Sequence, residues 1–564
     1  MKKINISYVI LMIIIALQIM LMIGFGFMKS GYHVDEIFSY GLSNSHFQPF
    51  LFDIDMFSDD PKSKFEHGIM ADQNQDFSEH TNKWESSEVY NDYVTVNANE
   101  TFDYASVYYN QTMDVHPPLY YFILNTVCSF FVGSFSKWYG ISVNLALFPI
   151  IQILLFKLCK ETFIKSERVS LLACCIYGFS ACAVSTVLFI RMYALLTMLL
   201  MAIIYNIIHI MKRTHFSFRH AIGLCVLIFL IALMHYYGII ASFVACAIMC
   251  IIMLCQKKFK LCFLYGVFAL GGVILSMAFF PAMIKHATRG YRGTDVLDKM
   301  KNVCIPVGNT TGMANFVSDA TGFGLKMSAF LLVVISLIVI ALLYNSIFKP
   351  MLKIKDFQAL WAFVRANLNF IAQHISEVYI ILFTFVMFYV FAAISPNMGK
   401  FSNRYCFLLY PLAAMILACF IAILVKNSRL KKIMAFALVS TLLINSCVKR
   451  TDIFLFKNGM DKPEIIDRLK GANCIYFVRY PMYVHNAAYV LRECDEVYVY
   501  YQDDNEELKN IVDSADKDKP LYIIVGAFRL NKGVIDGVDW GDTKVELIGK
   551  YVEYDNWALY EVVR

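Results

Sequence analysis

Hydrophobic stretches of about 20 residues recur along this chain, and a helix of that length crosses the roughly 30 Å of hydrocarbon in a bilayer. The chain has 564 residues, of which 58% are hydrophobic and only 17% are charged. A soluble protein of this size could not bury so much apolar surface. The sequence therefore predicts a polytopic α-helical membrane protein.

Five short loops rich in lysine and arginine determine the predicted topology. By the positive-inside rule they are cytoplasmic, as is the N-terminus. They lie at 157–168, 212–219, 257–260, 349–365 and 426–432. The first span has a long apolar part, and no small-x-small cleavage site follows it. We therefore interpret this span as a retained anchor and not as a signal peptide.

The apolar stretch 118–134 is the exception to this pattern. If it crossed the membrane, the basic loop at 157–168 would lie outside, against its charge. The stretch is short and begins at the Pro117-Pro118 pair, so we expect it to lie in the membrane interface. About eleven spans then remain. They are 8–28, 139–159, 169–189, 192–211, 220–238, 239–256, 261–284, 326–345, 378–395, 404–425 and 432–448.

Three polar parts of the chain are predicted to lie on the opposite, outer face. Within a membrane domain at 1–449, these are a first outer loop at 29–137, with interfacial helices, and a second at 285–325. The third part, 450–564, alternates apolar runs with helix-like stretches, which predicts a small α/β domain. Residues 53–103 are rich in Asp, Asn, Ser and Glu, and we expect a mobile loop there.

Two short acidic motifs are predicted to lie on this outer face. His33-Val-Asp35-Glu36 follows the first span, and Asp114-Val-His116 precedes the Pro-Pro pair. A carboxylate within hydrogen-bond reach of a hydroxyl can take its proton as that oxygen attacks. His116 could attract phosphate when protonated or bind a metal when neutral. The alternatives are an exposed acidic loop for the first motif and a simple helix start for the second.

Cations and aromatic side chains are predicted at further points on the same face. An arginine at a membrane boundary is costly, and its planar fork suits a phosphate. Snorkelling to water is the alternative for Arg191, and an aromatic belt is the alternative for His235 and Tyr236. The residues in question are Arg191, Tyr193, His235, Tyr236, Arg289, Arg292 and Arg404.

These segments resemble the GT-C membrane glycosyltransferases, and among them the protein O-mannosyltransferase and aminoarabinose-transferase superfamily. The resemblance covers about residues 8–425. It is carried by Asp35-Glu36, Asp114-Val-His116-Pro-Pro-Leu-Tyr-Tyr, Arg191-Met-Tyr-Ala-Leu, His235-Tyr-Tyr-Gly and Asn403-Arg404-Tyr405. It implies a GT-C fold with amphipathic helices in the first outer loop. It also implies an inverting enzyme that transfers a sugar from a polyprenyl-phosphate carrier to a hydroxyl acceptor.

The resemblance also implies roles for individual residues. Asp35 is the expected general base on the acceptor hydroxyl, and Glu36 is expected beside it in the catalytic pair, supporting the fold or the acceptor. The donor phosphate is expected to bind His116, Arg191, Tyr193 and Arg404, with Arg289 and Arg292 as further outer cations. The substrate is expected to contact Asp114, Tyr120, His235 and Tyr236. The sequence specifies no cofactor. Asp35, Glu36, Asp114 and His116 could bind a divalent cation, but no ligand spacing demands one, so metal dependence stays open.

Two other functions are compatible with such a chain. A polysaccharide ligase or polymerase would use outer arginines but would not need Asp35. A flippase or transporter of a lipid-linked sugar would place polar groups near the middle of the bilayer, where these spans carry almost no charge. The expected partners are a polyprenyl-phosphate-linked sugar donor, a protein, lipid or cell-envelope glycan acceptor, and membrane lipids, but no nucleic acid. Composition favours a bacterial cytoplasmic membrane, with the active site and C-terminal domain outside.

Overall fold

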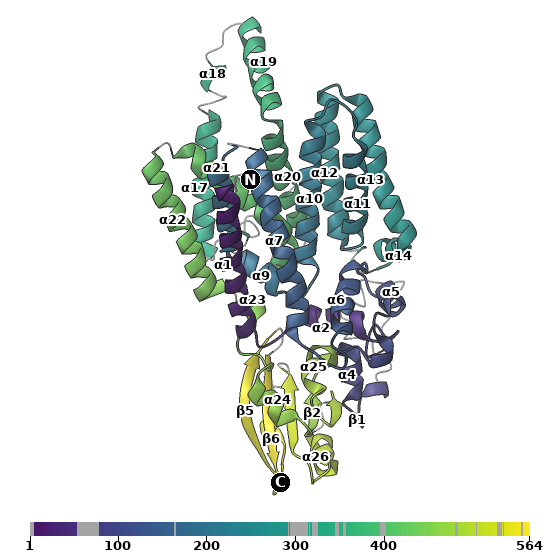
Figure 1. Ribbon diagram of the computed structural model, residues 1–564. Coiled ribbons are helices and arrows are strands. Elements are labelled where there is room, and N and C mark those ends of the chain that lie inside the picture. Colours follow the sequence, from purple (N-terminus) through teal and green to yellow (C-terminus); the bar gives the residue numbers. More distant parts are fainter. Residues whose placement is uncertain are drawn as a thin grey trace.

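Long apolar helices lie side by side in a bundle, and a mixed α/β domain closes one end of it (Figure 1). The computed structural model describes residues 5–52, 78–162, 165–290, 293, 314, 316–318, 325–344, 349–352, 357–394, 402–425, 427–450, 452–479, 483–502, 505–526, 533, 535–553 and 556–564. The bundle contains α1 (Ile6–Met28), α7 (Lys137–Glu161), α8 (Glu167–Gly178), α9 (Ala181–Leu188), α10 (Tyr193–Met211), α11 (Phe218–Ala232), α12 (Tyr236–Cys255), α13 (Phe259–Phe279), α17 (Leu325–Leu343), α18 (Lys349–Met351), α19 (Phe357–Gln373), α20 (Ile375–Ile394), η4 (Ser402–Leu409), α21 (Tyr410–Leu424), α22 (Ser428–Asn445) and η5 (Ser446–Arg450).

Within the described ranges, seven helices are long and apolar enough to cross a membrane, or eight if the bent pair α8 and α9 forms one span. These two helices meet at 60°. α11, α17 and α20 coincide with three further predicted spans. A helix is thus found at every predicted span position, although the count of about eleven spans is not confirmed.

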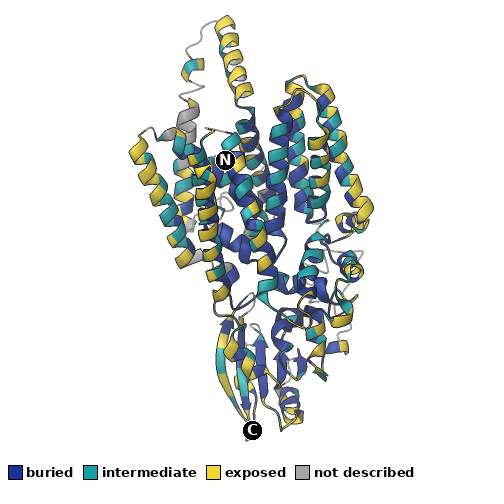
Figure 2. Ribbon diagram, viewed as in Figure 1, coloured by how far each residue is buried: buried dark blue, intermediate teal, exposed yellow. Residues whose placement is uncertain are grey.

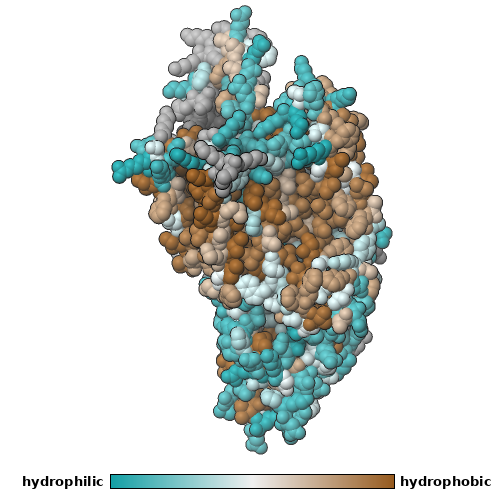
Figure 3. All heavy atoms as spheres, in the orientation of Figure 1, coloured by the Kyte–Doolittle hydropathy of each residue, from teal (hydrophilic) through white to brown (hydrophobic). Residues whose placement is uncertain are grey.

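A hydrophobic belt covers the bundle between two polar ends (Figure 3). The outward faces of α1, α13 and α22 are exposed, and these three are the least buried of the seven candidate spans (Figure 2). The N-terminus and α19 lie toward one end of the bundle, and the C-terminal domain closes the other (Figure 1). This arrangement is that of a multi-pass membrane protein, as predicted.

Short helices gather between the belt and the C-terminal domain (Figure 1). They are α2 (Val34–Asn44), α4 (Glu88–Val94), α5 (Tyr104–Met113), α6 (Leu119–Ser129) and α14 (Ala282–Thr288). α6 has 11 residues, and at 1.5 Å per residue it is only about 16 Å long, too short to span. This length agrees with the prediction that the stretch 118–134 does not cross the membrane.

Residues 78–103 are not the mobile loop that their polar composition predicts. They form η1 (Ser78–His80), β1 (Trp84–Ser86), α4 and η2 (Ala98–Glu100). β1 pairs with a strand of the C-terminal domain, and α4 packs on α2 through buried tyrosines. The prediction was wrong here because the partners that order this segment lie far away in the sequence. The part of the predicted loop at 53–77 lies outside the described residues.

The C-terminal domain is a mixed sheet with helices, as the alternating pattern predicts. The strand order is β1-β3-β2-β4-β6-β5. β3, β2 and β4 are parallel to one another, whereas β1, β6 and β5 pair antiparallel with their neighbours. The elements are α24 (Pro463–Leu469), β2 (Asn473–Phe477), α25 (Val484–Leu491), β3 (Glu496–Tyr500), α26 (Asn505–Ser514), β4 (Leu521–Gly526), η7 (Ile535–Gly537), β5 (Lys544–Val552) and β6 (Asn556–Val563).

A short linker, residues 452–462 with α23 (Asp452–Leu455), joins the bundle to this domain. Ser30, just after α1, lies against the linker: its backbone N–H donates to the Leu455 carbonyl (3.0 Å), and its hydroxyl donates to the Phe456 carbonyl (2.7 Å). Between β5 and β6, the buried Glu553 accepts hydrogen bonds from the backbone N–H of Tyr32 (3.1 Å) and of Met460 (2.7 Å). The C-terminal domain is therefore fastened to the segment that leads into α2.

Burial raises the pKa of Glu553 to about 7, although hydrogen bonds to Tyr489 and to the amides of Met460 and Tyr32 oppose the rise. A carboxyl group whose pKa is raised on folding stabilises the folded state below its usual value of 4.5, and this contribution is lost as the pH rises through 7. We expect the melting temperature of wild type, relative to Glu553→Gln, to fall between pH 5 and pH 8. If the difference in melting temperature between wild type and Glu553→Gln were constant over this range, the raised pKa of Glu553 would be contradicted.

Candidate active site

The first turn of α2 carries the predicted Asp-Glu pair and is closed by a capping box. His33 is the N-cap: its Nδ1 accepts a hydrogen bond from the Asp35 N–H (3.0 Å), while Glu36 accepts one from the His33 N–H (2.8 Å). Burial lowers the pKa of His33 to about 3, with Asp35 opposing and Arg404 adding to the shift. The ring is therefore neutral, as its acceptor role at Nδ1 requires.

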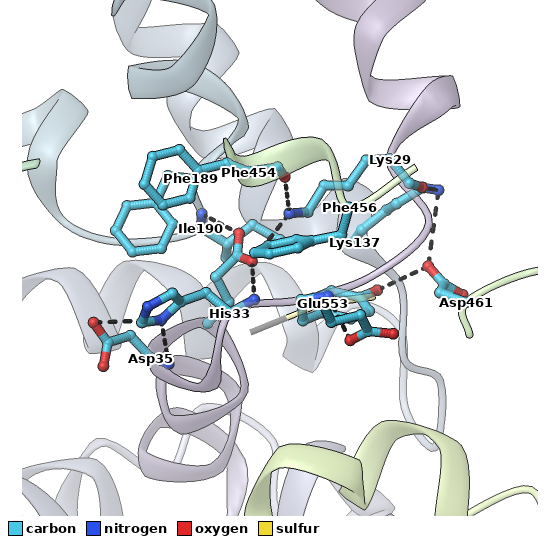
Figure 4. Close-up of polar contacts among 12 residues, drawn as sticks. Lys29, His33, Asp35, Lys137, Phe189, Ile190, Phe454, Phe456, Asp461 and Glu553 are labelled. Atoms are coloured by element: carbon cyan, nitrogen blue, oxygen red, sulfur yellow. Dashed lines mark hydrogen bonds and ion pairs between the residues drawn. The ribbon is translucent and has the colours of Figure 1, made fainter. Parts of the chain in front are cut away.

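Glu36 is fully buried, and its two carboxylate oxygens hold three segments together (Figure 4). Oε2 accepts from Lys29 Nζ (3.0 Å) at the end of α1, and Oε1 accepts from the Ile190 N–H (2.9 Å) between α9 and α10. Burial raises the pKa of Glu36, and Lys29 and the two amides oppose the rise. A side chain in this position fixes the backbone around the site and does not face a substrate.

Asp35, by contrast, has a side chain that is 24% exposed and faces Arg404. Its Oδ2 lies 3.0 Å from Nη2 of Arg404, which η4 brings in from late in the chain. Burial alone would raise the pKa of Asp35, but Arg404, and then His33 and Arg191, outweigh it and hold the pKa well below its usual range. The carboxylate is ionised and is more exposed than the neighbouring side chains of Asp114 (7%) and Glu36 (0%).

Arg191 lies in the break between α9 and α10, almost fully buried. Its Nη1 donates to Tyr121 Oη (3.0 Å), to Ser39 Oγ (3.2 Å) and to the Asp35 carbonyl (3.2 Å), and its Nη2 lies 3.3 Å from Nε2 of His116. Its Nε is buried without a hydrogen-bond partner among the described residues. This guanidinium therefore joins α2 to α6.

His116 and Asp114 form a close pair at the start of α6. His116 Nδ1 lies 2.7 Å from Asp114 Oδ2. Although burial opposes it, His116 lowers the pKa of Asp114, which is therefore ionised. An Nδ1–H that donates to this carboxylate leaves Nε2 as the acceptor for Arg191 Nη2, so the network assigns the tautomer of the ring.

Aromatic rings line the cluster on the side of α10 and α12. The His235 ring, at the N-cap of α12, has its centroid 5.6 Å from that of His116 and 6.0 Å from that of Tyr193. Tyr405 lies 6.3 Å from Tyr193 and 4.8 Å from Tyr237. These rings form an apolar side to an otherwise charged site.

The structure brings together most of the residues that the sequence predicts. Asp35, Asp114, His116, Arg191, Tyr193, His235 and Arg404 form one cluster, joined by the contacts above.

Five predicted residues are not part of this cluster, and the first of them is Glu36, whose side chain is buried against Lys29. Tyr120, on α6, is fully buried in the hydrophobic core. Tyr236 Oη lies 2.6 Å from His286 Nδ1 on α14. Arg289 is exposed at the C-cap of α14. Arg292 lies outside the described residues.

Several residues of the site were not predicted as such. Lys29 sits at the end of a span, where a lysine normally reaches water, and only its buried partner Glu36 reveals its role. Tyr121 was adjacent to the chosen Tyr120, but successive helix residues point about 100° apart, and it is Tyr121 that faces Arg191. His33 and Tyr405 belong to the motifs named above, but no role in the site was predicted for them.

The side chains proposed as metal ligands contact other charged groups of the site. In the part of the chain that the structure describes, no group of three or more His, Cys, Asp or Glu side chains is arranged to hold a metal ion. Of the four predicted ligands, Glu36 is paired with Lys29, Asp114 with His116, and Asp35 with Arg404.

No protein-family model matches this chain, and no curated protein matches it in sequence. The solved structure of ArnT from Cupriavidus metallidurans bound to undecaprenyl phosphate is similar over 98% of this chain and 97% of that chain, at 9% identity and a TM-score of 0.48. Its apo state is similar over 79% and 87%, at 9% identity and 0.42.

The archaeal oligosaccharyltransferase AglB from Archaeoglobus fulgidus, in complex with an inhibitory peptide and a dolichol-phosphate, is similar over 73% of this chain and 62% of that chain, at 11% identity and a TM-score of 0.37. ArnT, an aminoarabinose transferase, and AglB are both GT-C membrane glycosyltransferases, the class that the sequence motifs resemble.

Proposed function

We propose that this protein is an inverting glycosyltransferase that moves a sugar from a polyprenyl-phosphate carrier to a hydroxyl acceptor at the outer face of the membrane. The observation that carries the proposal is the partly exposed Asp35 carboxylate, 3.0 Å from Arg404 and next to the Arg191–His116 pair. A base beside two arginines, at the edge of an apolar belt, suits a reaction in which a hydroxyl is deprotonated and a lipid phosphate leaves.

In the proposed reaction, Asp35 takes the proton of the acceptor hydroxyl. The hydroxyl oxygen forms a bond to the anomeric carbon, and the bond from that carbon to the phosphate oxygen breaks. The phosphate leaves with the electron pair, so stabilising its charge matters more than protonating it. Attack from the face opposite to the leaving group inverts the anomeric carbon.

Arg191 and Arg404 would bind the phosphate of the donor. Arg191 has an Nε–H without a partner among the described residues, and a fork of this kind suits a phosphate oxygen. His116 orients Arg191 through the contact between Nε2 and Nη2. Tyr193 and His235 would contact the donor on the apolar side of the site.

Arg404 would couple donor binding to the strength of the base. As long as it faces Asp35, the pKa of that carboxyl stays well below its usual range, which makes Asp35 a weak base. A donor phosphate competes for the same guanidinium. When Arg404 turns toward the phosphate, the pKa of Asp35 rises, and proton transfer from the acceptor becomes more favourable.

Radiolabelled polyprenyl-phosphate sugars, supplied to membranes that contain the protein, test the proposed function. We expect wild type to move label to an acceptor, and Arg191→Gln to lose at least about 10-fold of this activity, since it lacks a charged hydrogen-bond donor. Arg429→Gln, which removes an exposed arginine at the start of α22, is the matched control and should keep the wild-type rate. No transfer from any sugar, or label that only crosses the membrane, would contradict the proposal.

The variant Arg404→Gln tests whether Arg404 binds the donor phosphate, which its coupling to Asp35 requires. We expect the donor KM to rise about 10- to 100-fold, because a hydrogen bond to a charged group is worth roughly 1.5–3 kcal/mol. The measurement is the initial rate of transfer against donor concentration. Arg429→Gln removes an exposed arginine at the start of α22 and should leave KM unchanged. Equal donor KM values for wild type and Arg404→Gln would exclude Arg404 as a phosphate ligand.

A further inference from the structure

The segment between α1 and α2, residues 29–33, is held from outside the bundle. Ser30 exchanges backbone hydrogen bonds with the linker, because the Asp461 N–H also donates to the Ser30 carbonyl (2.9 Å). A Cβ built on Gly459 would lie 2.2 Å from that carbonyl oxygen, so the two chains cross at a distance that only glycine permits. The position of this segment thus depends on the path of the linker.

Glu553 holds the same segment from the C-terminal domain. Its Oε1 accepts from the Met460 N–H and from the Tyr489 hydroxyl, and its Oε2 accepts from the Tyr32 N–H. The side chain is buried, and a Cβ on Gly31 would lie 2.6 Å from its Cδ. A carboxylate that satisfies three donors from three segments, with no room around it, can occupy only one position.

The hydrogen bond from the Tyr32 N–H to Glu553 lies one residue before His33, the N-cap of α2. His33 follows, and its ring and amide fix the N–H of Asp35 and the carboxylate of Glu36. A shift of the Tyr32 backbone therefore moves the first turn of α2, and with it the Asp35 carboxylate. Arg191 and Arg404 contact this turn but are carried by other elements, so their backbone is not attached to the segment that moves.

We infer that Glu553 is a positioning residue for Asp35, and that the C-terminal domain thereby completes the active site of the membrane domain. The inference rests on the proposed function, since it assigns Glu553 to the same reaction. It gives the C-terminal domain a part in catalysis that does not require it to bind the acceptor.

The variant Glu553→Gln tests the inference in the full-length protein, at pH 8, where the carboxylate is ionised. Glutamine has one acceptor oxygen instead of two, so at least one of the three donors loses its partner. We expect kcat per folded molecule to fall about 10- to 100-fold, the range for a small misplacement of a reacting group. The donor KM should change less than kcat, because Arg191 and Arg404 are carried by elements other than α2.

The matched control is Glu546→Gln on the same hairpin, a carboxylate whose side chain is 46% exposed. It should leave kcat and KM unchanged. A purely structural role for Glu553 would lower the amount of folded protein but not kcat per folded molecule, as measured on the monodisperse fraction. An unchanged kcat in that fraction would overturn the inference.

If Glu553→Gln does not fold, Tyr489→Phe tests whether Glu553 positions Asp35. Phenylalanine keeps the ring contact with Tyr32, whose centroid lies 4.7 Å away, and removes one of the three donors. We expect kcat to fall less than in Glu553→Gln, and the donor KM to change less than kcat. An unchanged kcat would overturn the inference. A wild-type protein that transfers no sugar would instead refute the proposed function, so the two failures are distinguishable.

Discussion

Replacing Asp35 by asparagine is expected to reduce sugar transfer about 100- to 10,000-fold, the usual contribution of a positioned general base. Asparagine has nearly the same shape and leaves the capping box of His33 and Glu36 in place. The donor should bind at least as tightly as to wild type, because Arg404 no longer pairs with a carboxylate at 3.0 Å and is available to the phosphate. The variant thus separates catalysis from donor binding.

The measurement combines initial rates of transfer with donor binding in the same purified protein. Asp103→Asn serves as the matched control. Asp103 caps α5 by accepting hydrogen bonds from the N–H groups of Ala105 and Ser106, a role that asparagine fills equally well. This control should keep the wild-type rate. A wild-type rate in Asp35→Asn would show that another group accepts the proton, and would favour the ligase or polymerase alternative.

The local patterns of the sequence predicted the elements of the fold well. The apolar runs in the C-terminal part form strands β2 to β6, and the long apolar stretches form helices. Both predictions depend on the periodicity of nearby residues alone. The topology argument also placed Asp35 and Arg404 on the same face, where the structure finds them paired. It could not predict the pairing, since charge patterns give the side of the membrane and not the distance between two residues.

What the sequence did not predict depends on partners that are distant in the chain. The polar stretch around β1 looks disordered by composition, yet Trp84 pairs with Tyr498 across a sheet. Glu553 looks like any exposed acid in a hairpin, and its burial follows only from the approach of Tyr32. In the same way, Glu36 was expected to support the fold or the acceptor beside Asp35, but the sequence did not indicate that its partner is Lys29. Adjacent residues in a helix point in different directions, so one acid faces the site and the other the core.

The variant Lys29→Met is expected to cost about 3–5 kcal/mol in the free energy of unfolding, because it leaves the Glu36 carboxylate buried without its ion partner. The side chains of Lys29 and Glu36 are both fully buried and lie 3.0 Å apart. Lys29 also donates to the Phe454 carbonyl of the linker, so the variant loosens the link to the C-terminal domain as well (Figure 4). Equilibrium unfolding in detergent measures the effect.

Lys160→Met is the control for this variant, because it breaks an ion pair at the surface. Lys160 and Glu167 have side chains that are 36% and 30% exposed, and such pairs contribute only about 0–1 kcal/mol. Adding Glu36→Gln to Lys29→Met removes the unpaired charge and should recover part of the loss, but not all, since Gln has one acceptor oxygen for the Ile190 and His33 amides. Equal losses for Lys29→Met and Lys160→Met would show that Glu36 is not held by a buried charge. The turn that carries Asp35 would then depend on its capping box and on the hydrogen bonds from Glu553 and the linker.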